Sequence, residues 1–213
     1  MMKQALVVLA LIGLGFAAPQ PKKIFHEHFE DFMDIIIEDA GEELEHILEH
    51  YLEFEEFTNA LAYIETYSFR DLLLEMESTP EFIAVVDFLE NDNIDIHYFI
   101  DVINEALGMN SVKKSNRLSA TRHELSGTDI SAFMNDCIAV FPKARLSALF
   151  DDKLANDEEF ATTISNLQSD EWNQVFSALL DSESFKKEAA AFLENGIDVH
   201  IVFDEVMAIF GQN

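Results

Sequence analysis

The sequence predicts an all-α protein made of two tandem homologous repeats, and three observations support this prediction. Large apolar side chains recur every three or four residues along most of the chain, which is the period of an amphipathic helix. Only 7 glycines and 4 prolines interrupt 213 residues. Segments within residues 88–108 reappear within residues 192–211, which indicates an internal duplication.

The duplication is clearest near the end of each copy. Phe-Leu-Glu-Asn occurs at 88–91 and again at 192–195, and Ile-Asp-x-His occurs at 94–97 and again at 197–200. His97 and His200 lie 103 residues apart, and the same offset relates Phe57 to Phe160, Phe69 to Trp172 and Phe82 to Phe185. We therefore expect about five or six amphipathic helices in each copy.

Apolar periodicity and capping residues place the helices of the first copy. We expect a helix from residue 24 to about 38, an interruption at Gly41 followed by a second helix, a third from residue 55, a fourth capped by Ser68, a fifth opened by Thr79-Pro80, and a last one between the capping residue Asp95 and Gly108.

The second copy, residues 128–213, follows the same plan. Phe133, Cys137 and Phe141 mark its first helix, Pro142 precedes the next, and Asp198 caps the last. Between the copies, residues 109–127 are rich in Ser and Asn and carry four basic residues, so we expect an exposed linker open to trypsin-like proteases. Residues 18–108 form the first repeat, and the two repeats are expected to make one globular unit.

Residues 1–17 have the pattern of a secretory signal peptide. Lys3 supplies the positive start, residues 5–14 the apolar stretch, and Gly15-Phe16-Ala17 the small-residue cleavage site. The apolar run is shorter than the roughly 20 residues that a membrane span needs. A secreted, soluble mature protein is therefore expected.

Charge and cysteine content exclude some classes of function. The formal net charge of −28 disfavours binding to nucleic acids, which are recognised by basic surfaces. Cys137 is the only cysteine, so no internal disulfide is possible and stability must come from burial. Because Cys137 shares a helical face with Phe133 and Phe141, we expect a buried, unreactive thiol.

The histidines are the only candidates for metal or catalytic chemistry. His46 to His50 match the H-x-x-E-H pattern of some zinc proteases, but both would point away from the apolar stripe of their helix, and no third ligand is evident. His26 and His28 lie near an end of the mature chain that we expect to be frayed. His97 and its repeat partner His200 are each expected to help stabilise the start of a helix. We expect no catalytic residue, no metal and no cofactor.

The remaining signal is an excess of large apolar side chains, including 19 phenylalanines. Burying one such side chain contributes roughly 2 kcal/mol or more. Periodicity does not distinguish a filled core from a hollow one lined by the same residues. Both interpretations therefore remain open at this point.

Three marks give the chain a resemblance to a known family. They are the acidic step before an aromatic residue (Asp157 to Phe160, and Glu55 to Phe57), the two Phe-Leu-Glu-Asn segments, and Ile-Asp-x-His before each closing helix. With these marks the chain resembles the insect allergen-related repeat family, whose members include the major cockroach gut allergen and mosquito midgut microvillar proteins. The resemblance covers nearly the whole mature chain.

The resemblance implies a secreted protein of the midgut lumen or microvillar surface, and an all-α capsule around a large apolar cavity that holds fatty acids or phospholipids. Such a protein is expected to be a monomeric, non-enzymatic lipid carrier. The residues expected to line the cavity are Phe29, Phe32, Ile36, Leu48, Leu61, Ile64, Phe69, Leu73, Phe82, Val86, Phe99, Ile103, Phe133, Cys137, Phe141, Leu149, Phe160, Ile164, Trp172, Phe176, Phe185, Phe192, Phe203, Val206 and Phe210. Two alternatives from the same resemblance are a detoxifying enzyme like the nitrile-specifying proteins of plant-feeding larvae, and a structural protein of the gut lining.

The carrier interpretation also implies transient contact with membranes when lipid is exchanged, and lysis of those membranes is an extension of the same activity. Fatty acids or phospholipids are its expected partners. No contact with nucleic acid is expected.

Overall fold

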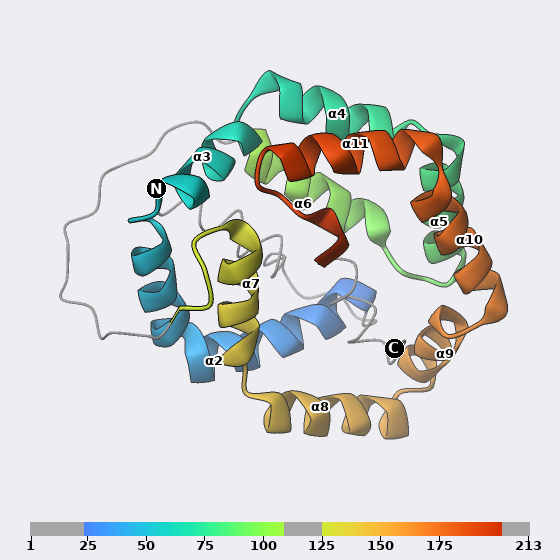
Figure 1. Cartoon of the computed structure of the whole chain (residues 1–213). Helices are drawn as coiled ribbons and strands as arrows, with labels where there is room; N and C mark the ends of the chain where they lie inside the picture. Colours follow the sequence, from blue (N-terminus) through green and yellow to red (C-terminus); the bar gives the residue numbers. More distant parts are fainter. Residues whose placement is uncertain (1–23, 109–124, 202–213) are drawn as a thin grey trace.

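The computed structural model describes residues 24–108 and 125–201, and these ranges contain ten helices and no strand. This confirms the all-α prediction. The helices are α2 (Phe25–Tyr51), α3 (Glu55–Ile64), α4 (Tyr67–Glu77), α5 (Pro80–Asn91), α6 (Ile96–Gly108), α7 (Ile130–Ala139), α8 (Lys143–Asn156), α9 (Glu158–Leu167), α10 (Asp170–Asp181) and α11 (Glu183–Glu194) (Figure 1). A further helical turn begins at Val199.

Helix boundaries recur at a fixed spacing along the chain. The bounds of α3 and α9 differ by 103 residues, as do those of α5 and α11, and α4 begins 103 residues before α10. At this spacing the two Phe-Leu-Glu-Asn segments are out of step by one residue, so Leu89 rather than Phe88 corresponds to Phe192. The two segments therefore repeat in sequence but stand one residue apart in their positions along α5 and α11.

Helices of one half pack against helices of the other half as well as against neighbours in their own half. The pairs α4 with α11, α5 with α10, and α2 with both α7 and α8 are in contact. In Figure 1, α4 and α11 run alongside each other at one edge of the molecule, while α7 and α8 adjoin α2 at the opposite edge. The two halves are therefore interleaved through their helices.

Gly41 does not interrupt the first helix, contrary to the prediction. The helix α2 runs without a break through this residue. A glycine inside a helix costs only about 1 kcal/mol, and apolar burial along the rest of a long helix outweighs that cost. In the second half Pro142 separates α7 from α8, because proline lacks the N–H that a continuous helix requires. Phe141, expected inside the first helix of that half, lies between α7 and α8.

Side-chain caps fix several helix starts. Thr79 caps α5, with Pro80 in its first turn, as predicted. Thr66, not Ser68, caps α4: its hydroxyl accepts a hydrogen bond from the backbone N–H of Phe69 at 3.2 Å. Asp198 accepts a hydrogen bond from the N–H of His200 at 3.0 Å, which confirms its predicted role.

The buried apolar residues form two clusters, and each draws on both halves of the chain. The first cluster comprises Ile36, Ala40, Leu44, Ile47, Leu48, Tyr51, Phe57, Ala60, Leu61, Ile64, Phe69, Ile130, Ala132, Phe133, Met134, Cys137, Phe192 and Ile197. The second comprises Val85, Ile94, Phe160, Ile164, Leu167, Trp172, Phe176, Leu179, Phe185 and Ala189. The first cluster is drawn mainly from residues 36–69 and the second mainly from residues 160–189, and residues of the other half complete each one.

The expected signal peptide, residues 1–17, lies outside the described residues, as does most of the expected linker, residues 109–127. Among the described helices, none is both long enough and apolar enough to span a membrane.

Candidate functional site

The residues predicted to line an apolar interior fall into three groups. Those that are buried are Ile36, Leu48, Leu61, Ile64, Phe69, Val86, Phe133, Cys137, Phe160, Ile164, Trp172, Phe176, Phe185 and Phe192. Those that are half-buried are Phe29, Phe32, Leu73, Phe82, Phe99, Phe141 and Leu149. The side chains of Ile103, Phe203, Val206 and Phe210 lie outside the described residues.

Aromatic rings in direct contact form the centre of the first cluster. The ring centroids of Phe57 and Phe133 are 5.0 Å apart, and Tyr51 lies 5.5 Å from the first and 5.3 Å from the second. The Tyr51 hydroxyl donates a hydrogen bond of 2.6 Å to Asp136. Burial, followed by this hydrogen bond, raises the pKa of Tyr51 well above its ordinary value. The hydroxyl is thus held neutral inside an apolar wall.

The second cluster contains the only tryptophan of the chain. Trp172 stacks on Phe176 with centroids 5.2 Å apart, and Phe88 from the first half lies 5.3 Å away on a tilted plane. All three rings belong to α5 and α10, which pack together across the two halves. Trp172 therefore reports on the interior surface between the halves.

A third apolar region, between α2 and α6, is less completely buried. Phe29 and Phe99 meet edge to face with centroids 5.7 Å apart, and neither belongs to the two clusters. Both rings remain half-buried. Leaving part of a phenylalanine ring in water costs free energy in proportion to the exposed apolar area. This region would gain from an apolar ligand that covered it.

Two histidines near the start of α2 are buried, which contradicts the expected frayed terminus. His26 donates its backbone N–H to Asp95 Oδ1 at 3.1 Å, and its ring Nδ1 contacts Asp95 Oδ2. The imidazole also stacks on Tyr98, with centroids 4.0 Å apart. Asp95, predicted only as the cap of α6, thus ties the start of α2 to the start of α6.

His28 belongs to a second buried polar group. Its Nδ1 lies 3.0 Å from Lys153 Nζ, and its Nε2 lies 3.5 Å from Asp157 Oδ2. Lys153, only 6% exposed, also forms an ion pair with Asp31. Burying an unpaired ammonium group is costly. The contacts in this network of His28, Asp31, Lys153 and Asp157 therefore compensate for the burial of Lys153.

The sequence held one signal for this network. Lys153 follows Leu146, Leu149 and Phe150 at helical spacing, so it falls on the apolar stripe of α8 rather than on a solvated face. A lysine in such a position requires a buried acidic partner. The partner itself was not predictable, because Asp31 lies 122 residues earlier in the chain.

Asp157 connects the buried network to an open polar pocket. Its Oδ1 caps α9 by accepting the backbone N–H groups of Glu159 and Phe160 at 3.1 and 3.0 Å. The Phe160 hydrogen bond is the main cause that lowers the pKa of Asp157, and the charges of His28 and Lys153 lower it further. Asp157 is therefore held ionised.

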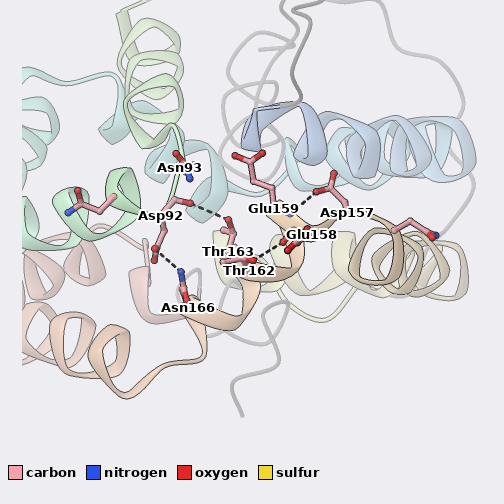
Figure 2. Close-up of a pocket in the computed structure, with 10 residues that line it drawn as sticks. Asp92, Asn93, Asp157, Glu158, Glu159, Thr162, Thr163 and Asn166 are labelled. Carbon is pink, nitrogen blue, oxygen red and sulfur yellow. Dashed lines mark hydrogen bonds between the residues drawn. The ribbon is translucent and has the colours of Figure 1, made fainter.

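The pocket lies between the turn after α5 and the first half of α9, so it joins the two halves. Its volume is about 660 Å³, and its lining residues are Asn91, Asp92, Asn93, Asn156, Asp157, Glu158, Glu159, Thr162, Thr163 and Asn166. Figure 2 shows Asp92 bridging to α9: its Oδ1 accepts the Asn166 amide at 2.8 Å, and its backbone carbonyl accepts the Thr163 hydroxyl at 3.2 Å. Four carboxylates and no basic side chain line this pocket, so it repels anions.

The other predicted histidines are not brought together. His97 is exposed and lies 3.3 Å from Glu90, and the ring of His200 meets Phe185 edge to face. His46 and His50 are half-buried rather than fully exposed, and both make contacts within the structure. Among the described residues, no group of three or more His, Cys, Asp and Glu side chains has the geometry to hold a metal ion.

Comparison with known proteins agrees with the fold and with the repeated motifs. The family model described as insect allergen related repeat, nitrile-specifier detoxification matches residues 25–203. Protein G12 of Anopheles gambiae is 22% identical over 214 residues, a match that covers 98% of this chain and 98% of that protein. The family match spans both halves and every described helix, so the chain belongs to the insect allergen related repeat family.

Proposed function

We propose that this chain is a non-catalytic lipid carrier that holds the acyl chains of fatty acids or phospholipids against its phenylalanine-rich interior. The observation that carries the proposal is the half-buried aromatic surface between α2 and α6, where Phe29 and Phe99 meet outside the packed clusters. An acyl chain laid on these rings would remove their remaining apolar area from water. The resemblance to the insect allergen-related repeat family implies a lipid-holding cavity and favours the same proposal.

The free energies involved are sufficient for binding. An acyl chain of about fifteen methylenes gains ~12 kcal/mol on leaving water, and association and ordering costs remove much of that gain. A ligand that binds only the folded state also stabilises it, by an amount that grows with the ratio of ligand concentration to Kd. We therefore expect the lipid-loaded protein to unfold at a higher temperature than the lipid-free protein.

The polar end of an ionised fatty acid does not fit the pocket beside α9. Asp92, Asp157, Glu158 and Glu159 line that pocket, and their negative charges would repel a carboxylate. We place the carboxylate of such a ligand away from this pocket, at the solvent-facing end of the acyl chain.

Quenching by brominated fatty acid tests whether the acyl chain extends to the second cluster, because Trp172 is the only tryptophan and lies in that cluster. Bromine quenches indole fluorescence only at short range. We expect dibromostearic acid to quench Trp172, and unbrominated stearic acid to compete with the quenching. Mass spectrometry of an organic extract of natively purified protein should detect the bound lipid. Absence of both signals would reject the carrier.

A pair of substitutions locates the acyl chain. Phe99→Asp places a charge on the half-buried surface and should reduce lipid recovery several-fold. Tyr67→Asp, at an exposed position on α4, is the matched control and should leave recovery unchanged. Equal recovery from both variants would show that the chain does not lie between α2 and α6.

We also propose that the protein is a secreted monomer of the midgut lumen or microvillar surface that contacts membranes transiently to exchange lipid. Membrane lysis would be an extension of this activity. If liposomes retain their contents at every lipid load, the proposal of lysis is rejected. The family description includes nitrile-specifier detoxification, which is the enzymatic alternative. Turnover that requires added iron would favour that enzyme, whereas tight association with gut-lining material and no extracted lipid would favour a structural role.

A further inference from the structure

Glu188 is a buried carboxylate inside an apolar helix face. It lies on α11 between Phe185 and Phe192, at the spacing that points all three side chains toward the interior. The residue is 1% exposed, and within the described part of the chain neither carboxylate oxygen has a hydrogen-bond partner. Buried polar groups are nearly always paired, so this exception requires an explanation.

The repeat shows that the fold does not need a carboxylate at this position. The offset of 103 residues relates Glu188 on α11 to Val85 on α5, and Val85 is buried in the second cluster. At the equivalent position of the first half, an apolar valine packs in the core without any polar group. The carboxylate is thus a property of the second half, introduced at a cost in desolvation.

The groups that face Glu188 do not neutralise it. Across the contact with α4 lies Glu75, another acid, whose Oε1 pairs with Lys187 Nζ at 3.8 Å near the surface. On α10, which also contacts α11, Asp181 pairs with Lys186 at 3.2 Å. Burial is the main cause that raises the pKa of Glu188, the Glu75 charge adds to the shift and the Lys187 charge opposes it, and together they bring the pKa to about 7.

We propose that Glu188 makes the contact between α4 and α11 a pH-sensitive seam, closed while the carboxyl group is neutral and loosened when it ionises. No described residue pairs with an ionised Glu188 in the closed seam, so water must reach it by separation of the two helices. The charge is hydrated at much lower cost in the opened seam, where the carboxyl group has its ordinary acidity.

The direction of the effect follows from proton linkage. The closed seam holds its proton up to about pH 7, whereas an opened seam releases it near the ordinary value of 4.5. The stabilising contribution is complete below that ordinary value and is lost as the pH rises toward 7. Over this window the opening equilibrium should increase about tenfold per pH unit, and it should level off above it.

Hydrogen exchange of the full chain, read by mass spectrometry between pH 5 and pH 8 and corrected for intrinsic rates, tests the proposal. In the wild type, protection of peptides from α4 and α11 should fall about tenfold per pH unit up to neutrality. In Glu188→Gln, which cannot ionise, the same peptides should keep constant protection. Glu194→Gln, an exposed position on the same helix, is the control and should behave as the wild type.

Two further measurements keep the test decisive if Glu188→Gln folds poorly. Glu188→Val copies the residue at position 85 and should also abolish the pH dependence. In the wild type, the side-chain carbon resonance of Glu188 should titrate near neutrality, and Glu75→Gln should move that midpoint to lower pH. Parallel protection profiles in wild type and Glu188→Gln, or a Glu188 midpoint near its ordinary value, would overturn the proposal.

Discussion

Lys153 depends strongly on its partners, because its ammonium group is buried while its acidic partner Asp31 is not. The side chain of Lys153 is 7% exposed, compared with 37% for Asp31. Asp31→Asn would leave a buried cation without its carboxylate and should lower the free energy of unfolding by about 3 kcal/mol. Lys153→Met would leave a carboxylate that water can reach, and should cost about 1 kcal/mol.

Urea unfolding monitored by circular dichroism measures both values under identical conditions. The ordering of the two variants is the test, since it follows from which partner is buried. A larger loss for Lys153→Met than for Asp31→Asn would contradict the assignment of the buried charge to the lysine.

Cys137 is fully buried, and burial raises the pKa of its thiol to about 12, with the nearby Asp136 charge adding to the shift. The thiolate is the reactive form, so native Cys137 should react with a thiol reagent at pH 8 at least about a hundredfold more slowly than the denatured chain. Time courses of thiol labelling, quenched at intervals with and without urea, give the reaction rates of the denatured and native chains. Equal rates would mean that the thiol is accessible in the folded protein.

Residue-scale predictions from the sequence succeeded where a face of one helix decided the outcome. Cys137 shares its helix face with Phe133, and its burial was predictable from that spacing alone. His26 and Asp95 are 69 residues apart, and their contact depends on how α2 and α6 meet. No local pattern carries that information, so the buried histidines were mistaken for a frayed end.

At the scale of elements, the helices α5 and α11 end in the same hydrogen-bonded motif. The N–H of Ile94 donates to the carbonyl of Leu89 at 2.9 Å, and that of Ile197 donates to Phe192 at 3.0 Å. The residue before each isoleucine, Asn93 or Gly196, has a positive φ of 61° or 81°. This is the Schellman motif, in which glycine is favoured at the left-handed position.

Exchanges at these two positions should have opposite effects on stability. Gly196→Ala should destabilise the fold by about 1 kcal/mol, because an alanine is strained at this positive φ. The added Cβ would meet the Ala60 Cβ at an ordinary 3.6 Å, so no steric clash contributes. Asn93→Gly should be neutral or stabilise by up to about 1 kcal/mol. Thermal unfolding of the two variants gives the comparison, and a stabilised Gly196→Ala would contradict it.

Helix ends also show where prediction from sequence reaches its limit. Pro142 was a reliable signal, since proline removes a hydrogen bond that a continuous helix requires. Gly41 was not, because its cost is small enough for the packing of α2 against α7 and α8 to exceed it. Thr66 and Ser68 were equally able to cap α4 by composition, and the choice depends on the turn that precedes the helix.

For the whole molecule, the mixed composition of both core clusters predicts that neither half folds alone. Phe69 contacts Phe192 with centroids 5.0 Å apart, and Phe57 contacts Phe133, so each half lacks apolar partners when separated. Fragments 18–108 and 128–213 should each show no cooperative unfolding transition, and mixing them should restore one. Circular dichroism during urea titration reads this outcome, and a cooperative transition in either isolated fragment would contradict it.

The periodic apolar pattern was enough to predict the fold class, because amphipathic helices must bury one face whatever their order. It was not enough to place the polar pocket beside α9, which forms where Asp92 of one half meets Asn166 of the other. Apolar periodicity also does not determine whether the interior is a filled core or a hollow one. The half-buried rings of Phe29 and Phe99 are the structural feature that bears on it.

The crossed pairing of α4 with α11 and of α5 with α10 has a consequence for the history of the chain. Since α10 repeats α4 and α11 repeats α5, both pairs are the same contact made twice, which is the self-complementary interface of a two-fold symmetric dimer. An ancestor of two identical subunits, joined end to end, would account for this arrangement. In such an ancestor both equivalent positions would have carried one residue, and Val85 and Glu188 could differ only after the subunits were joined.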